Sequence, residues 1–390
     1  MKDYVAYIKN KFSNEVNLLI LLSRDELARQ EISLFVKNID WDLFLELTLK
    51  HRLVSHIYKH SQYLEEFIPP GIVEKIKQIK IDQSGKSLNY TVYLIQIHQR
   101  LIENSILHCF FKGPLLSLDL YNDAGFRNFG DIDILVEKNN VEKARQIIEN
   151  LGFNCIYPRM KLTERQRNAN YSISHHYHFK HQYKNIDIEL HWSITNPQSF
   201  FGKNTSELIA KSEKIKINTI DAPYISRVDN LVFLAAHGSI HQWYRLFWLK
   251  DFSVLLSKTN PGDFKKAVEL SRFLKLEKCF SQACLMSHVI YNTEIPAFFK
   301  SNKREEYLIQ IPLKSIQLNE LKQQGVTGKI KYVLYRFKLK PDIKYYFDLT
   351  YRLRTHLSDW EILKLPNKLF FLYYILRPFL LIYKNSPLKR

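Results

Sequence analysis

Two aspartates one residue apart inside an apolar run constrain this chain more than any other feature of its sequence. The run extends from Asp131 to Val136 and follows a shorter apolar run that ends in Lys112-Gly113. Alternate side chains of a β-strand share a face, so Asp131 and Asp133 point the same way while the aliphatic residues between them face a core. Two carboxylates about 4 Å apart repel by about 4 kcal/mol at an effective dielectric of about 20. A magnesium ion relieves this repulsion and leaves room for phosphate oxygens.

The same run has a simpler interpretation, in which a solvated strand end carries two incidental aspartates. The glycine turn upstream favours the metal site, because a turn that follows a strand and precedes a carboxylate pair is typical of proteins that hold a metal-bound triphosphate. We therefore predict that Asp131 and Asp133 are metal ligands.

Length and charge limit the class of protein and its partners. A chain of 390 residues can bury a substantial core and hold two or three subdomains. The 57 Lys and Arg exceed the 39 Asp and Glu and give a net charge of +18, which favours anionic partners, namely nucleotides, nucleic acid or an acidic membrane face. The four cysteines lack CxxC spacing and are expected to be reduced core thiols. With no signal-peptide pattern and no apolar stretch long enough to cross a membrane, we expect a cytoplasmic protein without a transmembrane segment.

The periodicity of apolar residues divides the chain into three parts. Residues 1–105 predict helices, with a break at Pro69-Pro70-Gly71. Residues 106–197 predict strands at 107–111, 132–136, 153–157, 176–183 and 186–192, with a helix at 141–150 and a two-residue turn at Lys184-Asn185. Residues 198–390 are again predicted to be mainly helical. The expected fold class is α+β, with a small mixed β-sheet core inserted between predominantly helical N- and C-terminal regions.

A third carboxylate is expected from the run that ends in Trp192. Residues 186–192 alternate strictly, so Asp187, Glu189 and His191 share the face opposite the apolar residues. A strand of this kind beside the Asp131 strand completes three carboxylates, which is what two-metal phosphoryl or nucleotidyl transfer requires. Spacing alone does not choose between Asp187 and Glu189.

These motifs together resemble a known family. Lys112-Gly113, the stretch from Arg127 to Val136, and Glu189-Leu-His-Trp192 are similar to the bacterial family labelled "uncharacterised nucleotidyltransferase", of the polymerase-β-like superfamily. Stretches around residues 237–251 and 365–378 also resemble that family's helical regions.

The resemblance implies an enzyme that moves a nucleoside monophosphate from a nucleoside triphosphate to an acceptor, which is a small molecule, a protein or RNA. It implies two Mg²⁺ ions. Asp131 and Asp133 are expected to bind both ions, and Glu189 is expected to be the third carboxylate ligand. One departure is Gly113-Pro114, where the superfamily has Gly-Ser or Gly-Gly. Proline removes an amide, although it suits the first turn of a helix.

Three residues are candidates for binding the nucleotide. Lys112 and Gly113 lie at the expected helix start, whose free amides bind phosphate. Arg127 lies in the loop before the aspartates and can clamp a phosphate through two hydrogen bonds, although a surface salt bridge explains it equally well.

Other features leave alternatives open. His237 and His241 are four residues apart on a predicted helix and form a weak candidate zinc pair. Asp251 is expected to brace the helical region through an ion pair with Arg245. The basic and aromatic run 329–340 is either a nucleic-acid face or a solvated helix. The alternative function is a non-catalytic module of the same fold that binds RNA or a protein through its basic surface.

Overall fold

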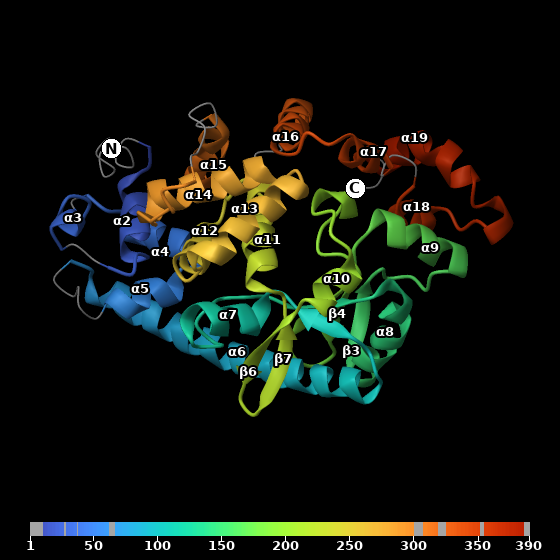
Figure 1. Ribbon diagram of the computed structural model, residues 1–390, viewed down its shortest axis with the longest axis horizontal. Coiled ribbons are helices and arrows are strands. Elements are labelled where there is room, and N and C mark those ends of the chain that lie inside the picture. Colours follow the sequence, from blue (N-terminus) through green and yellow to red (C-terminus); the bar gives the residue numbers. More distant parts are fainter. Residues whose placement is uncertain are drawn as a thin grey trace.

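The computed structural model describes residues 11–26, 29–36, 38–61, 67–299, 307–318, 325–351 and 355–385. Figure 1 shows helices at both ends of the chain packed around and above a central sheet. The N-terminal helices and the helices that follow the sheet lie side by side on the left of the view, and the last helices lie at the upper right.

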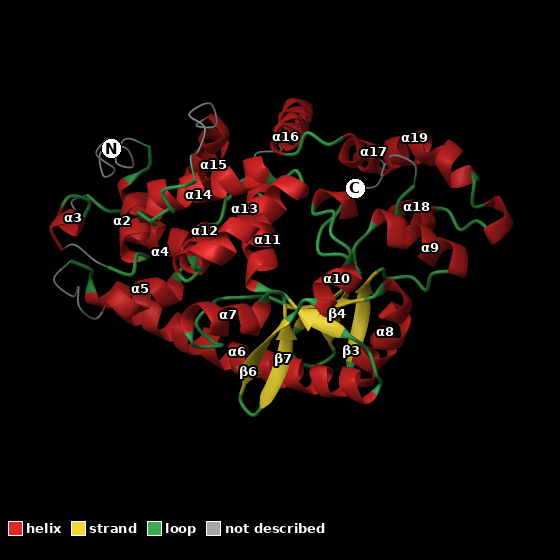
Figure 2. Ribbon diagram, in the orientation of Figure 1, coloured by secondary structure: helices red, strands yellow, loops and turns green. Residues whose placement is uncertain are grey.

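A single mixed sheet of seven strands lies at the centre, in the order β3-β4-β5-β2-β1-β7-β6 (Figure 2). Its strands are β1 His108–Phe110, β2 Ile132–Val136, β3 Phe153–Tyr157, β4 His176–His181, β5 Asp187–His191, β6 Glu213–Ile217 and β7 Ile220–Tyr224. Strand β2 pairs antiparallel with β1 and parallel with β5. All five residues of β2 are buried, because helices cover both faces of the sheet at this central position.

The N-terminal region is helical, as predicted. It contains α2 Asn14–Leu22, α3 Arg29–Ser33, α4 Trp41–Lys50, α5 Val54–Ser61 and α6 Pro70–Glu103. Asp40 caps α4 by accepting the amides of Asp42 and Leu43, and a proline in the first turn of α6 needs no amide partner. Helix α6 extends beneath the sheet in Figure 1 and contacts α7, α8 and β7.

Short helices connect the strands. They are α7 Gly113–Tyr121, α8 Val141–Asn150, α9 Glu164–Ile173 and α10 Thr205–Ala210, with 3₁₀ turns at Lys138–Asn140 and Gln198–Phe200. A capping box between Thr163 and Gln166 starts α9. Helix α7 begins directly after β1 and contacts β2, so its N-terminus lies beside the strand that carries the aspartates.

The C-terminal helices form a second layer. They are α11 Arg227–Ile240, α12 Leu246–Ser257, α13 Pro261–Phe273, α14 Glu277–Tyr291, α15 Tyr307–Leu318, α16 Gly325–Leu339, α17 Ile343–Tyr351, α18 Leu357–Ile362 and α19 Leu372–Asn385. Helices α11 to α14 share the main core with the sheet. Helices α18 and α19 pack with α9 around Trp360 and Tyr373 in a smaller separate core.

The fold class is confirmed, while two local predictions are wrong. Strands β2 and β3 and helix α8 have the predicted bounds. The β4–β5 connection is longer than two residues, since the His181 amide donates to the Ile186 carbonyl at 3.0 Å and leaves a loop of residues 182–185. The mainly helical prediction from residue 198 missed the β6–β7 hairpin, which extends the sheet beside β1.

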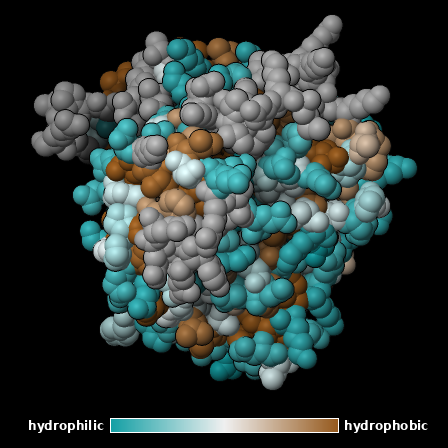
Figure 3. All heavy atoms as spheres, turned by 90° about the vertical axis from the view of Figure 1, so that its left-hand side faces the viewer, coloured by the Kyte–Doolittle hydropathy of each residue, from teal (hydrophilic) through white to brown (hydrophobic). Residues whose placement is uncertain are grey.

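The surface and the cysteines can be compared with the composition. Within the described residues, no helix is both long and apolar enough to cross a membrane. On the face shown in Figure 3, hydrophilic side chains surround smaller hydrophobic areas. All four cysteines are free thiols, and three of them are buried.

Candidate active site

Asp133 and Glu189 lie directly opposite one another on neighbouring strands. The parallel β2–β5 register pairs Asp133 with Glu189, and both side chains project from the same face of the sheet. Oxygens of these two carboxylates and a ring nitrogen of His191 lie within 4.8 Å of one another. The predicted proximity of a second acidic strand to the Asp133 strand is therefore present in the structure.

Asp187, the alternative third carboxylate, has another partner. Its carboxylate accepts a hydrogen bond of 2.8 Å from His178 on β4. It lies two residues before Glu189 and precedes the first residue pair of β2 and β5, which is Ile132 with Ile188. Glu189, rather than Asp187, is therefore the β5 carboxylate opposite Asp133.

A lysine and a histidine contact the Asp133–Glu189 pair. Lys112 Nζ lies 2.8 Å from Asp133 Oδ1, and His191 Nε2 lies 3.2 Å from Asp133 Oδ1 and 3.1 Å from Glu189 Oε2. Burial acts to raise the pKa of Asp133, but Lys112 and the His191 hydrogen bond outweigh it and lower that pKa. Burial acts to lower the pKa of His191, and the two carboxylates raise it overall. Asp133 is therefore ionised and held by positive charge.

One oxygen of this buried carboxylate has no partner. Asp133 is 1% exposed, and its Oδ2 makes no hydrogen bond to any described residue. A buried ionised oxygen without a partner is costly unless a cation or a ligand binds it. The donor set of carboxylate oxygens fits a hard divalent cation such as Mg²⁺.

Asp131 lies immediately before β2, at the edge of this cluster. Burial and the nearby Asp133 carboxylate raise the pKa of Asp131 to about 7, while Lys112 acts to lower it. Among the described residues, the group of atoms within 4.8 Å contains Asp133 and Glu189 but not Asp131. Asp131 is thus a neighbour of the pair whose carboxylate charge is disfavoured until more positive charge arrives.

The glycine turn lies against the backbone of the aspartate strand. Gly113 has φ +63°, and a Cβ at this position would lie 3.2 Å from the Asp131 carbonyl oxygen. A side chain is therefore disfavoured by conformation and by space. Pro114 lies in the first turn of α7, as predicted. Because proline has no backbone N–H, the helix start beside the carboxylates has one amide fewer to donate.

Arg127, predicted to clamp a phosphate, already has a carboxylate partner. Its Nε donates to Asp251 Oδ2 at 2.8 Å, and both side chains are almost fully buried. Tyr121 donates to the other Asp251 oxygen at 2.9 Å. This network joins α7 to α12, so the partner of Asp251 is Arg127 rather than the predicted Arg245. The nucleotide-binding role of Arg127 stays a prediction.

Sequence reasoning missed Arg52, which comes from the N-terminal helices. Within the described residues, neither Arg52 nor Arg245 forms an ion pair. Burial and the charge of Arg245 lower the pKa of Arg52, while the charge of Asp131 acts to raise it. The two guanidinium groups thus lie near each other and near the carboxylates. Arg245 also contacts the rings of Tyr244 and Trp248.

Hydrogen bonds between His51 and the first residues of α12 place these two arginines together. The Leu246 amide donates to His51 Nδ1 at 3.1 Å, and the Phe247 amide donates to the His51 carbonyl at 3.3 Å. Arg52 follows in the left-handed region at φ 58°. No local pattern around residue 52 indicates this tertiary contact, so Arg52 could not be selected from the sequence.

The turn before α12 is fixed by close packing. A Cβ on Gly238 would lie 2.2 Å from the Trp243 ring, so only glycine fits there. The Trp243 indole donates to Gln282 at 3.0 Å on α14. This packing holds the segment that carries Arg245.

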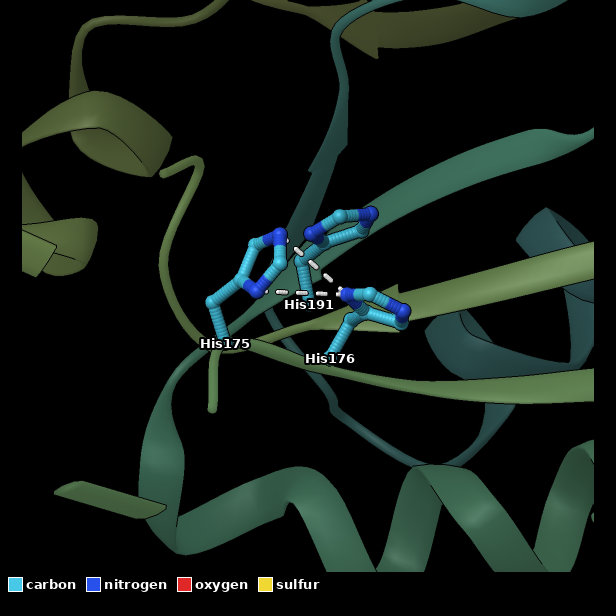
Figure 4. A group of neighbouring side chains, drawn as sticks. All are labelled: His175, His176 and His191. Carbon is cyan, nitrogen blue, oxygen red and sulfur yellow. Dashed lines mark hydrogen bonds between the residues drawn. The ribbon is translucent and has the colours of Figure 1, made fainter. Parts of the chain in front are cut away.

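Several histidines surround the carboxylates. Figure 4 shows His175, His176 and His191 turned toward one another from the ends of β4 and β5. Among the described residues, His237 and His241 do not join any group of three possible metal ligands, and their rings pack on Trp248 instead. No third ligand for the candidate zinc pair of His237 and His241 is therefore present among the described residues.

One family model matches the chain. The family described as "Uncharacterised nucleotidyltransferase" matches residues 37–292, which are more than half of the chain and include α4 to α14 with the whole sheet. No curated protein matches it. The carboxylates, the glycine turn and both unpaired arginines lie within the matched region. The chain therefore belongs to the uncharacterised nucleotidyltransferase family.

Proposed function

We propose that this protein transfers a nucleoside monophosphate from a nucleoside triphosphate to an acceptor hydroxyl or phosphate. An acceptor oxygen forms a bond to the α-phosphorus, the bond to the β-phosphate breaks, and pyrophosphate leaves. The observation that carries the proposal is the buried Asp133 carboxylate, opposite Glu189 and beside a glycine turn, with one oxygen unpaired. Family membership supports the same chemistry.

Asp131, Asp133 and Glu189 would hold two Mg²⁺ ions. When bound, such ions activate the attacking hydroxyl and neutralise the triphosphate. The protein's own contribution is to hold the three carboxylates in place on a rigid sheet. Lys112 Nζ lies 2.8 Å from Asp133 Oδ1, so its ammonium group is near enough to contact a phosphate that approaches the carboxylates.

The triphosphate is expected to bind along the basic side of the site. The start of α7 offers its remaining amides after Pro114. Arg52 and Arg245 are suited to the β- and γ-phosphates, because they are close, half-buried and form no ion pair with any described carboxylate. A polyanion between them relieves their mutual repulsion.

Thermal unfolding with each of the four nucleoside triphosphates, with and without Mg²⁺, tests the donor site. A ligand at about 100 times its dissociation constant adds about 2.7 kcal/mol of stability, which is readily measured. We expect a Mg²⁺-dependent increase with at least one triphosphate, and its loss in the Asp131→Ala/Asp133→Ala variant.

A folded protein that responds to no triphosphate would contradict the proposal. It would instead favour the non-catalytic module, for which the net charge of +18 is the main support. That module binds RNA with an affinity that falls steeply with salt and survives the loss of both aspartates.

A further inference from the structure

Three histidines beside the carboxylates form a cluster with no role in the proposed transfer. His175 immediately precedes β4, His176 begins it, and His191 ends β5. The β4–β5 register places His176 opposite His191, and one ring nitrogen of each of the three lies within 4.8 Å of the others. The three rings face one another, although the start of β4 and the end of β5 supply them separately (Figure 4).

Two of these rings are already at the separation of metal ligands. His176 Nδ1 lies 3.3 Å from His175 Nδ1 and 3.2 Å from its Nε2. A tetrahedral zinc ion with Zn–N bonds of about 2.0–2.1 Å holds its nitrogens roughly 3.3 Å apart. Only His191 has to approach for three ligands to converge.

Glu189 contacts the His191 imidazole and lies beside the His176 imidazole. His191 Nε2 lies 3.1 Å from Glu189 Oε2, and His176 Nε2 lies 3.8 Å from Glu189 Oε1. Metal-ligating histidines generally donate the other ring N–H to a carboxylate, which fixes the orientation of the ring. In both histidines this contact uses Nε2 and leaves Nδ1 as the ligand atom. Nδ1 of His191 now lies 3.3 Å from the Ser193 carbonyl, a long contact that a cation can replace.

We propose that His175, His176 and His191 bind one transition-metal cation of the Zn²⁺ class. Imidazole nitrogen suits such ions, whereas Mg²⁺ prefers oxygen ligands. Three protein ligands leave a fourth position for water or a substrate oxygen. The ion would also fix the His191 ring, which touches both Asp133 and Glu189, and so would hold the two carboxylates in position.

Metal binding to the full-length protein tests this site without nucleotide. The protein is treated with a chelator and titrated with Co²⁺, whose visible absorption reports tetrahedral nitrogen coordination, and Zn²⁺ is then added as a competitor. We expect one equivalent of Co²⁺ to bind and Zn²⁺ to displace it. His175→Ala and His176→Ala should each weaken binding by at least about tenfold, since losing even an outer partner of a ligand costs that much.

His178→Ala is the matched control, because His178 lies on the same strand but pairs with Asp187. It should bind Co²⁺ like the wild type. Asp133→Asn should also retain the signal, which separates this site from the carboxylates and from any failure of nucleotidyl transfer. If an alanine variant unfolds, His176→Asn is measured in its place.

Three results would overturn the proposal. One is the absence of visible Co²⁺ absorption with the wild-type protein. Another is an unchanged titration in both histidine variants. The third is loss of the signal in Asp133→Asn with retention in the histidine variants, which would assign the ion to the carboxylates.

Discussion

Two arginines contact the same aromatic ring, but the fold gives them different charged neighbours. Arg127 lies 5.5 Å and Arg52 lies 5.4 Å from the centre of the Phe247 ring. Arg127 is buried and paired with Asp251, which also accepts from Tyr121. Arg52 is half-buried beside a second unpaired arginine, Arg245.

We interpret Arg127 as a residue that stabilises the fold, and we propose that Arg52 and Arg245 bind a ligand. The fold neutralises Arg127 itself, so that side chain contributes to joining α7 and α12. Among the described residues, it gives neither Arg52 nor Arg245 an ion pair, although Asp131 lies near enough to act on Arg52. An anionic ligand would relieve the repulsion between the two guanidinium groups. Perturbed charges near a cluster of carboxylates are typical of functional sites.

The largest expected effect is on stability, from breaking the buried pair. Arg127→Met leaves the Asp251 carboxylate buried without its partner, which should lower the free energy of unfolding by about 3–5 kcal/mol. Urea unfolding followed by circular dichroism measures the change. Arg127→Met/Asp251→Leu should recover part of the loss. A single variant as stable as the wild type would contradict the structural role of Arg127.

The next effect should be on binding alone. Arg52→Gln/Arg245→Gln should weaken Mg²⁺-dependent triphosphate binding roughly 100-fold, because each hydrogen bond to a charged group contributes about 1.5–3 kcal/mol. Isothermal titration calorimetry measures the affinity. The free energy of unfolding should stay unchanged or rise, since the repulsion between the two arginines is removed.

Arg100→Gln is the matched control for that variant, because Arg100 is an exposed arginine on α6 whose ion pair with Glu103 is exposed as well. Its triphosphate affinity should equal that of the wild type. If the double variant binds with wild-type affinity, the unpaired arginines do not bind the phosphates.

A smaller effect should appear as the pH is lowered. Burial, with the charges of Arg245 and Lys50, lowers the pKa of His51 to about 3, and its Nδ1 accepts the Leu246 amide that positions the arginines. In the unfolded chain the group titrates near pH 6.5, so below that pH the unfolded state binds a proton that the folded state excludes. Stability should therefore fall by about 1.4 kcal/mol per pH unit between about pH 6 and 4 from this histidine.

His51→Gln should reduce the slope of stability against pH over that range. Urea unfolding at a series of pH values measures it for both proteins. Equal slopes would show that His51 is not held neutral by the fold, and the joint that positions Arg52 would then need another explanation.

The sheet side of the site could be predicted from sequence because its signals are local. Strict alternation placed Glu189 and His191 on one face, and the apolar run fixed the bounds of β2. Which β5 carboxylate lies opposite Asp133 depended on the register between two strands, which pairs Asp133 with Glu189, while Asp187 contacts His178.

The helical side could not be predicted in the same way. Arg52 and Arg245 are 193 positions apart and meet through hydrogen bonds that the ring and the carbonyl of His51 accept from the Leu246 and Phe247 amides, which leave no periodic pattern. The β6–β7 hairpin was missed because β6 pairs only with β7 and has an exposed, charged edge, so it lacks the apolar run of a central strand.

The central claim is that Asp133 serves nucleotidyl transfer, and the fate of the α-phosphate tests it most directly. The protein is incubated with Mg²⁺, a cell extract as the source of acceptor, and triphosphates labelled with ³²P at either the α- or the γ-position. We expect α-label on an acceptor, γ-label released as pyrophosphate, and a loss of roughly 1000-fold in Asp133→Asn, since metal binding supplies several kcal/mol to the transition state. Transfer of the γ-label, or α-transfer that Asp133→Asn retains, would contradict the assignment.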